Sequence, residues 1–194
     1  MISLNILFTE LAKVFDKNNK LELLAKVTLE NTDNDICLPS SNNHLDKSII
    51  NVMTKKDAHP ACKTILKIPF DWVPPTTNQD PLYIQHSVAK AHVELIGPKG
   101  LVKSNNIRIG LYGMLPNTEY GVRTHPADEI YVMLAGKAFW QVNEKSFLGH
   151  KTGDRSYHPS MVEHANRTGN EAFMSVYVWH GDISTEQYVY HGIR

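Results

Sequence analysis

The most constraining feature of this sequence is a set of three metal-ligand side chains in two separate segments. His125 and Glu129 form a His-x-x-x-Glu step within the segment 123–136, and His164 ends the segment 153–164. Two neutral imidazoles and one carboxylate suit a divalent first-row metal. The sequence therefore predicts one divalent transition metal, and these donor types accept iron, manganese, zinc, nickel or cobalt alike.

Tyr131 follows two residues after Glu129, in a stretch typical of a β-strand. Successive strand residues point to opposite faces, so Glu129, Tyr131 and Met133 share one face and the residues between them share the other. Both faces are largely apolar. We expect a barrel strand whose inner face lines a pocket and whose outer face is covered by helices. The Tyr131 phenol is then a candidate acid or base beside the metal.

The composition of the chain changes near residue 75. Before it, Leu4, Leu7 and Leu11 recur at helical spacing, and a second apolar run comprises Leu21, Leu23, Leu24 and Val27. Both runs predict amphipathic helices, a further short helix is expected within residues 42–56, and residues 65–75 read as extended, proline-limited chain. These signals predict a helical N-terminal subdomain over residues 1–75, packed on a barrel over residues 76–194.

After residue 85 the pattern is one of short β-rich runs separated by turn residues. The clearest runs are residues 92–96, 107–112, 129–134, 138–142 and 173–179. Several strands at a spacing of roughly 8 to 12 residues are typical of a β-barrel or a sandwich. We expect a mainly β fold with a helical N-terminal cap.

Charge and composition exclude several classes of partner. The chain has 20 basic and 20 acidic side chains, and no basic patch interleaved with aromatics that would indicate a nucleic-acid partner. No apolar stretch reaches the ~20 residues that cross a bilayer, so no membrane partner is expected. The N-terminal residues lack a basic leader, and Cys37 and Cys62 lack metal-finger spacing. These features favour the cytoplasm.

The ligand spacings resemble the two signatures of the cupin superfamily. Gly136 follows Glu129 at the expected interval, and the segment 153–164 carries glycine, proline and His164 in the expected order. The resemblance implies a double-stranded β-helix, the jelly-roll barrel of cupins. Arg123 stands where the signature has its first histidine, and a guanidinium has no lone pair for a metal. Three conventional protein ligands then remain.

The residues that flank the ligands resemble the cupin-type dimethylsulfoniopropionate (DMSP) lyases. The similarity covers roughly residues 90–183 and rests on the motifs Pro116–Tyr120, His125–Tyr131, Leu134–Gly136, His158–Ser160, His164–Thr168 and Val178–Asp182. It implies a metal-dependent carbon–sulfur lyase that acts on a small molecule and releases dimethyl sulfide and acrylate. Barrel cupins often pair, so a homodimer is possible.

The resemblance also implies roles for individual side chains. Tyr131 would be the base, its pKa lowered by the metal, and Tyr120 is a second catalytic candidate. Arg123 could bind the substrate carboxylate in place of the missing histidine ligand. Trp140 and Trp179 are candidates to surround the sulfonium, because aromatic faces attract cations. His158 is a candidate for substrate binding or for a hydrogen bond to a ligand. For each aromatic or histidine the competing interpretation is packing in the core.

Two other functions stay open at this point. The same two-histidine, one-carboxylate set with open positions serves metal-dependent oxygenases and isomerases that act on small organic acids. A cupin that binds a small ligand without turnover is the third possibility. Dimethyl sulfide release, oxygen consumption and binding without turnover distinguish the three.

Overall fold

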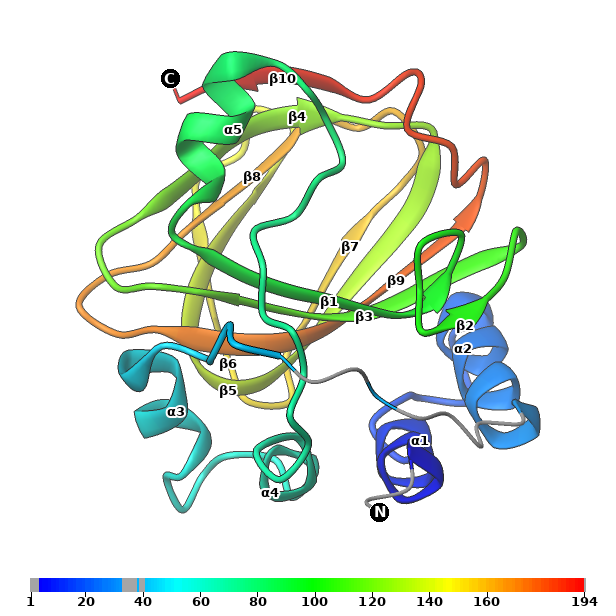
Figure 1. Ribbon diagram of the computed structural model, residues 1–194. Helices are drawn as coiled ribbons and strands as arrows, with labels where there is room; N and C mark the ends of the chain where they lie inside the picture. Colours follow the sequence, from blue (N-terminus) through cyan, green and yellow to red (C-terminus); the bar gives the residue numbers. More distant parts are fainter. Residues whose placement is uncertain (1–3, 33–37, 39–40, 194) are drawn as a thin grey trace.

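The computed structural model describes residues 4–32, 38 and 41–193 (Figure 1). Its helices are α1 (Leu4–Ala12), α2 (Lys20–Asn31), α3 (Lys47–Met53), α4 (Ala61–Ile65) and α5 (Pro81–Ser87). Its strands are β1 (Lys90–Gly97), β2 (Val102–Lys103), β3 (Ile107–Met114), β4 (Glu119–Thr124), β5 (Ala127–Val142), β6 (Leu148–Lys151), β7 (Arg155–His158), β8 (His164–Arg167), β9 (Phe173–Gly181) and β10 (Val189–Gly192).

The first helices form where the apolar periodicity predicts them, although the buried face of α2 differs from the prediction. Leu21, Ala25 and Leu29 are buried, whereas Leu23 and Val27 are 41% and 44% exposed. The first three lie one helical turn apart and share a stripe. The apolar run in the sequence therefore mixed two faces of the helix.

The short helix α5 was not predicted from the sequence and lies within the segment assigned to the barrel. The side chain of Asp80 accepts hydrogen bonds from the backbone N–H groups of Leu82 and Tyr83, and Pro81 occupies the first turn. An acceptor side chain at the N-cap followed by proline is a strong helix start. Helix α5 packs against β4 and β10, away from the other helices (Figure 1).

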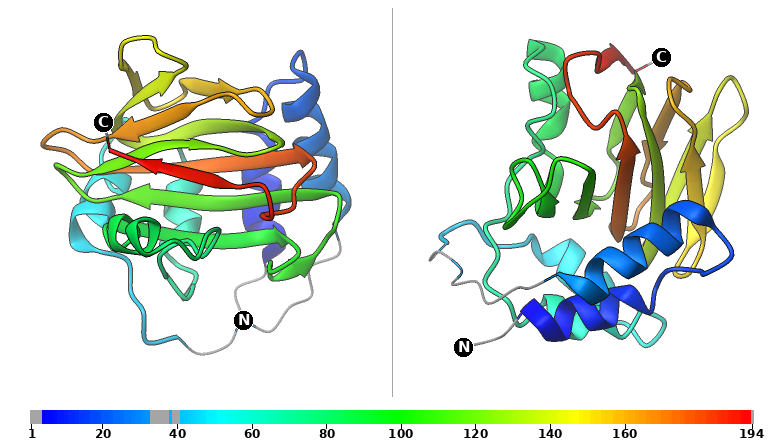
Figure 2. Two further views of the ribbon diagram at one scale, coloured as in Figure 1. Left: turned by 90° about the horizontal axis from the view of Figure 1, so that it is seen from above. Right: turned by 90° about the vertical axis from the view of Figure 1, so that its right-hand side faces the viewer.

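The strands follow one hydrogen-bonded path in the order β10-β4-β8-β5-β9-β3-β1-β2, with β6 and β7 also paired to β5. The runs 129–134 and 138–142 belong to the single strand β5, where the sequence suggested two strands. Its first half pairs with β9 and its last residues pair with β8. Strand β5 thus belongs to both walls of the barrel: β9, β3 and β1 continue one wall, and β8, β4 and β10 continue the other (Figure 2).

The two faces of β5 enter two different cores, as strand parity predicted. Ile130, Val132 and Leu134 pack in a core that contains residues of α1, α2, α3 and α4, while Tyr131 and Met133 face an aromatic core inside the barrel. Helices α1–α4 cover the outside of the β5–β9 wall (Figure 1). The predicted fold class is confirmed: a mainly β cupin double-stranded β-helix with N-terminal helices.

Three other predictions concern the chain as a whole. The division near residue 75 stays a prediction; the helices before it share one hydrophobic core with the barrel. No helix within the described residues is long and apolar enough to cross a membrane. Cys37 lies outside the described residues, and Cys62 is buried with its thiol pKa raised by burial to about 12.

Candidate metal centre and its pocket

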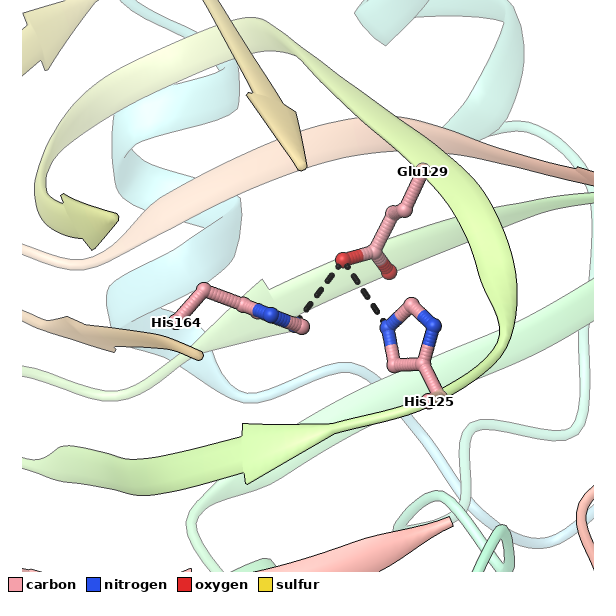
Figure 3. A group of neighbouring side chains, drawn as sticks. All are labelled: His125, Glu129 and His164. Carbon is pink, nitrogen blue, oxygen red and sulfur yellow. Dashed lines mark ion pairs between the residues drawn. The ribbon is translucent and has the colours of Figure 1, made fainter. Parts of the chain in front are cut away.

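His125, Glu129 and His164 converge inside the barrel, from elements that are distant in the sequence. His125 lies between β4 and β5, Glu129 is in β5, and His164 begins β8. Figure 3 shows the glutamate carboxylate between the two imidazoles. Glu129 Oε2 is 3.5 Å from His125 Nε2 and 3.2 Å from His164 Nε2, and the three ligand atoms lie within 4.8 Å of one another.

The two imidazoles are oriented as metal ligands usually are. His125 Nδ1 lies 3.1 Å from the carbonyl oxygen of Ala127, and His164 Nδ1 lies 2.9 Å from that of Val162. A carbonyl only accepts hydrogen bonds, so each Nδ1 carries the proton and each Nε2 presents a lone pair. Both Nε2 atoms are buried without a hydrogen-bond partner. Since buried polar atoms are ordinarily satisfied, these two fit a metal ion.

Glu129 is held by two donors that leave it facing the histidines. His158 Nδ1 lies 2.7 Å from Oε2, and Trp179 Nε1 donates to Oε1 at 2.5 Å. Burial raises the pKa of Glu129, but the imidazoles of His125, His158 and His164 outweigh it and hold the pKa well below its usual range. Burial holds the pKa of His164 well below its usual range. An ionised carboxylate and a neutral imidazole are the protonation states that bind metals.

A pocket opens beside this centre and is lined from both walls. Glu129, Tyr131 and Trp179 line it next to the metal group, and Arg123 and Tyr120 line it from β4. Further lining residues come from segments without a motif: Pro75, Thr76, Thr77, His92, Glu94, Lys99, Arg108, Tyr112, Tyr177, Thr185 and Tyr188. The pocket is therefore rich in aromatic rings and carries a few charged groups.

Arg123 supplies a buried positive charge to this pocket. Its guanidinium donates to the side-chain oxygen of Asn166 at 3.2 Å and to the carbonyl of Gly121, and lies 3.9 Å from the centre of the Tyr120 ring. Among the described residues no carboxylate forms an ion pair with Arg123, which is 1% exposed. Glu129 offsets its charge only at a distance, and a buried charge without a close counter-ion is costly, so this guanidinium is suited to an anionic ligand.

The remaining predicted site residues divide between the pocket wall and the layer behind it. Tyr131 and Trp179 line the pocket, and Trp179 also stacks on His125 with ring centres 4.1 Å apart. Trp140 and His158 are not among the lining residues. Trp140 packs on the Tyr131 ring at 4.3 Å, and His158 joins Glu129 to the Ser156 hydroxyl.

The phenols of the pocket are neutral in the protein as it stands. Burial first, and then the charge of Glu129, raise the pKa of Tyr131 well above its usual value, while Arg123 lowers it. Burial likewise raises the pKa of Tyr120, whose hydroxyl bonds to that of Tyr188 at 2.6 Å. Ionisation of Tyr131 therefore needs positive charge nearby.

Several residues of the site carry no signal in the sequence. His92, Tyr177 and Tyr188 reach the pocket from β1, from β9 and from the segment before β10. None lies at ligand-like spacing from the motif residues, and tyrosine in a strand is ordinarily a packing residue. The alternation of β9 places Tyr177 on the same face as Trp179, and this was the only indication in the sequence that Tyr177 could line the pocket.

Comparison with known proteins places the chain in a family. Residues 42–175 match the family model described as dimethylsulfoniopropionate lyase. Dimethylsulfoniopropionate lyase DddQ of Ruegeria pomeroyi is 35% identical over 91 residues, which are 47% of this chain and 45% of that protein. The similarity thus spans about half the length of this curated relative.

Solved structures share the fold. One, from the crystal structures of the DMSP lyases RdDddP and RnDddQII, is 16% identical with a TM-score of 0.66 and covers 95% of this chain and 97% of its own. The DMSP lyase DddQ of Ruegeria pomeroyi DSS-3 is 22% identical with a TM-score of 0.60 and covers 79% of this chain and 80% of its own. The family-model match covers more than half of the sequence, and the chain belongs to the dimethylsulfoniopropionate lyase family.

Proposed function

We propose that this protein is a metal-dependent DMSP lyase, which eliminates dimethyl sulfide and leaves acrylate. The observation that carries the proposal is the pair of buried, unpartnered imidazole nitrogens that face Glu129 at the end of a pocket holding an unpaired arginine. Family membership and the lyase relatives support the same reaction.

The proposed metal ligands are His125, Glu129 and His164. A divalent metal bound there would act as a Lewis acid on the substrate carboxylate and favour loss of the proton α to it. Arg123 would bind the same carboxylate, because guanidinium and carboxylate form strong, directional hydrogen bonds. The arginine thereby takes a substrate-binding role at the position where the cupin signature has a histidine.

Tyr131 is the proposed base. Its phenolate would take the α proton, the electron pair of the C–H bond would form the carbon–carbon double bond, and the C–S bond would break to release neutral dimethyl sulfide. Tyr131 then holds the proton and returns it to water. The positive charge of Arg123, which lowers the pKa of Tyr131, and that of the metal would make the phenolate accessible.

The remaining predicted residues have proposed roles that follow from their places. Tyr120 and Trp179 line the pocket and are proposed to contact the substrate. Trp140 is proposed to hold the Tyr131 ring by packing, and His158 to hold the Glu129 carboxylate by its hydrogen bond. Tyr120 keeps its hydroxyl on that of Tyr188, which fixes the ring beside Arg123.

Metal analysis of the purified protein, combined with headspace detection of dimethyl sulfide from DMSP, tests the proposal. The expected result is one divalent metal per chain and dimethyl sulfide release that a chelator abolishes. His164→Ala should lose metal and activity, while His150→Ala should lose neither, because His150 lies outside the pocket with its Nδ1 near the carbonyl of Leu148. Consumption of oxygen without dimethyl sulfide would instead identify an oxygenase.

A further inference from the structure

A pair formed by His92 and Tyr177 occupies the pocket wall opposite Arg123. His92 Nε2 and the Tyr177 hydroxyl are 2.8 Å apart, and the two rings stack with centres 5.5 Å apart. Both residues line the pocket. Tyr177 is in β9 and His92 in β1, which belong to one wall, whereas Arg123 in β4 belongs to the other.

The strand between β9 and β1 is built to permit this contact. Gly110 of β3 pairs with Tyr177, and a Cβ at Gly110 would lie 2.5 Å from Tyr177 Cε1 and 2.7 Å from its hydroxyl oxygen. The tyrosine ring thus crosses β3 over a glycine to reach a histidine two strands away. The backbone of His92 is in turn fixed by reciprocal hydrogen bonds with Val73.

The hydrogen bond between His92 and Tyr177 determines what the Tyr177 oxygen offers to the pocket. Burial lowers the pKa of His92 to about 4, with a smaller contribution from the charge of Arg108. The imidazole is therefore neutral near pH 7, and one ring nitrogen can accept a hydrogen bond from the phenol. The charged residues that line this side of the pocket are Glu94, Lys99 and Arg108, of which Glu94 and Arg108 form an ion pair of 3.0 Å. In the tautomer protonated at Nδ1, His92 Nε2 accepts the Tyr177 O–H, and the Tyr177 oxygen then presents its lone pairs to a ligand.

We propose that the His92–Tyr177 pair is the subsite for the cationic group of the substrate, with the Tyr177 oxygen as the contact atom and His92 as a positioning residue. Tyr131 and Tyr177 are directly opposite across β5 and β9, with ring centres 6.1 Å apart. A substrate whose α-carbon lies at Tyr131 has its β-substituent one carbon away, next to Tyr177. The pair therefore selects zwitterions with a carboxylate and a compact onium group on the β-carbon. This assignment deepens the proposed function and rests on it.

Calorimetric competition between two non-eliminating probes isolates this subsite. The probe 3-(trimethylammonio)propanoate carries a cationic group on its β-carbon, and 4,4-dimethylpentanoate is its carbon analogue without that cationic charge. The wild-type holoprotein is expected to bind the charged probe about tenfold more tightly, since a desolvated electrostatic contact to a cation, of the strength of a cation–π pair, is worth about that factor. Equal affinities for the two probes would overturn the proposal.

Variants then assign the preference to the pair. Tyr177→Phe should reduce the ratio of affinities to about two or less. Tyr190→Phe is the matched control, because it removes the hydroxyl of another tyrosine–histidine pair, 2.8 Å from His86 Nδ1, that does not line the pocket, and it should keep the ratio. His92→Phe should lower the ratio while His92→Gln, which retains an acceptor, should restore it. A wild-type ratio in Tyr177→Phe overturns the proposal, and so does one in His92→Phe if Tyr177→Phe does not fold.

The outcome is separable from that of the lyase assay. A protein that prefers the charged probe, loses that preference in Tyr177→Phe and releases no dimethyl sulfide refutes the lyase and keeps the subsite. A protein that releases dimethyl sulfide, but whose variants keep the wild-type ratio of probe affinities, supports the lyase and refutes the subsite.

Discussion

At the scale of single residues, Tyr131 has the sharpest expected phenotype. Tyr131→Phe removes the proposed base and leaves the three ligands in place, so metal content should stay at the wild-type level while dimethyl sulfide release falls by about 10²- to 10⁴-fold. Tyr157→Phe is the control, because that ring is 46% exposed on the surface. Full turnover by Tyr131→Phe would remove the residue from the mechanism.

Arg123 is the second residue whose role can be separated by kinetics. Arg123→Gln removes the buried charge that is proposed to bind the carboxylate, so KM should rise by about 10- to 100-fold with a smaller change in kcat. Arg123→His, which restores the histidine of the cupin signature, should lose the same binding. Arg167→Gln alters an exposed arginine and should leave both constants unchanged. A gain of activity in Arg123→His would show that the arginine does not bind substrate.

At the scale of elements, β3 matters because Gly110 has no side chain and so leaves room for the Tyr177 ring. Gly110→Ala would place a Cβ 2.5 Å from the carbonyl oxygen of Val93 as well as against the Tyr177 ring, and the backbone oxygen cannot move aside. We expect a loss of about 1–3 kcal/mol of unfolding free energy, measured in urea, together with a reduced preference for the charged probe. In Gly149→Ala the new Cβ meets first the flexible end of Lys137 at 3.2 Å, and stability should change little.

The strand and helix patterns show which parts of the fold a sequence can predict. The alternation of β5 correctly separated Tyr131 and Met133 from Ile130 and Val132, because each face enters a different core. The apolar run of α2 failed because its exposed leucine and valine carry the same hydrophobic signal as the buried stripe. The metal ligands follow a spaced signature, whereas His92 and Tyr177 meet only because β1, β3 and β9 are neighbours in the sheet. Such long-range pairing has no local pattern.

At the scale of the whole molecule, Lys90 links the site to stability. Its side chain is buried, bonds to the Ser87 hydroxyl at 3.2 Å and lies 3.2 Å from the centre of the Tyr120 ring. Burial first, and then Arg123, lower the pKa of Lys90 to about 5. Between about pH 5 and the lysine's unfolded pKa of about 10.4 the unfolded chain holds the extra proton, so this group's contribution to stability rises with pH.

Lys90→Met should therefore raise the melting temperature at pH 7 and reduce the rise of stability between about pH 5 and pH 10. Thermal unfolding followed across this pH range measures both effects. Lys103→Met alters an exposed lysine and should change neither. A variant with the wild-type pH dependence would show that Lys90 keeps its proton in the folded protein.

The shared strand β5 limits how the two walls can move. One covalent chain passes through both of them, so their separation is fixed along β5 and can vary only by rotation about it. The amplitude of such a rotation grows with distance, and it is greatest at the free edges formed by β2 and β10. His92 and Tyr188 lie toward those edges, while Glu129 lies on the axis. His164, on β8, lies off that axis, so a metal bound by both Glu129 and His164 would limit the rotation and hold the two walls together.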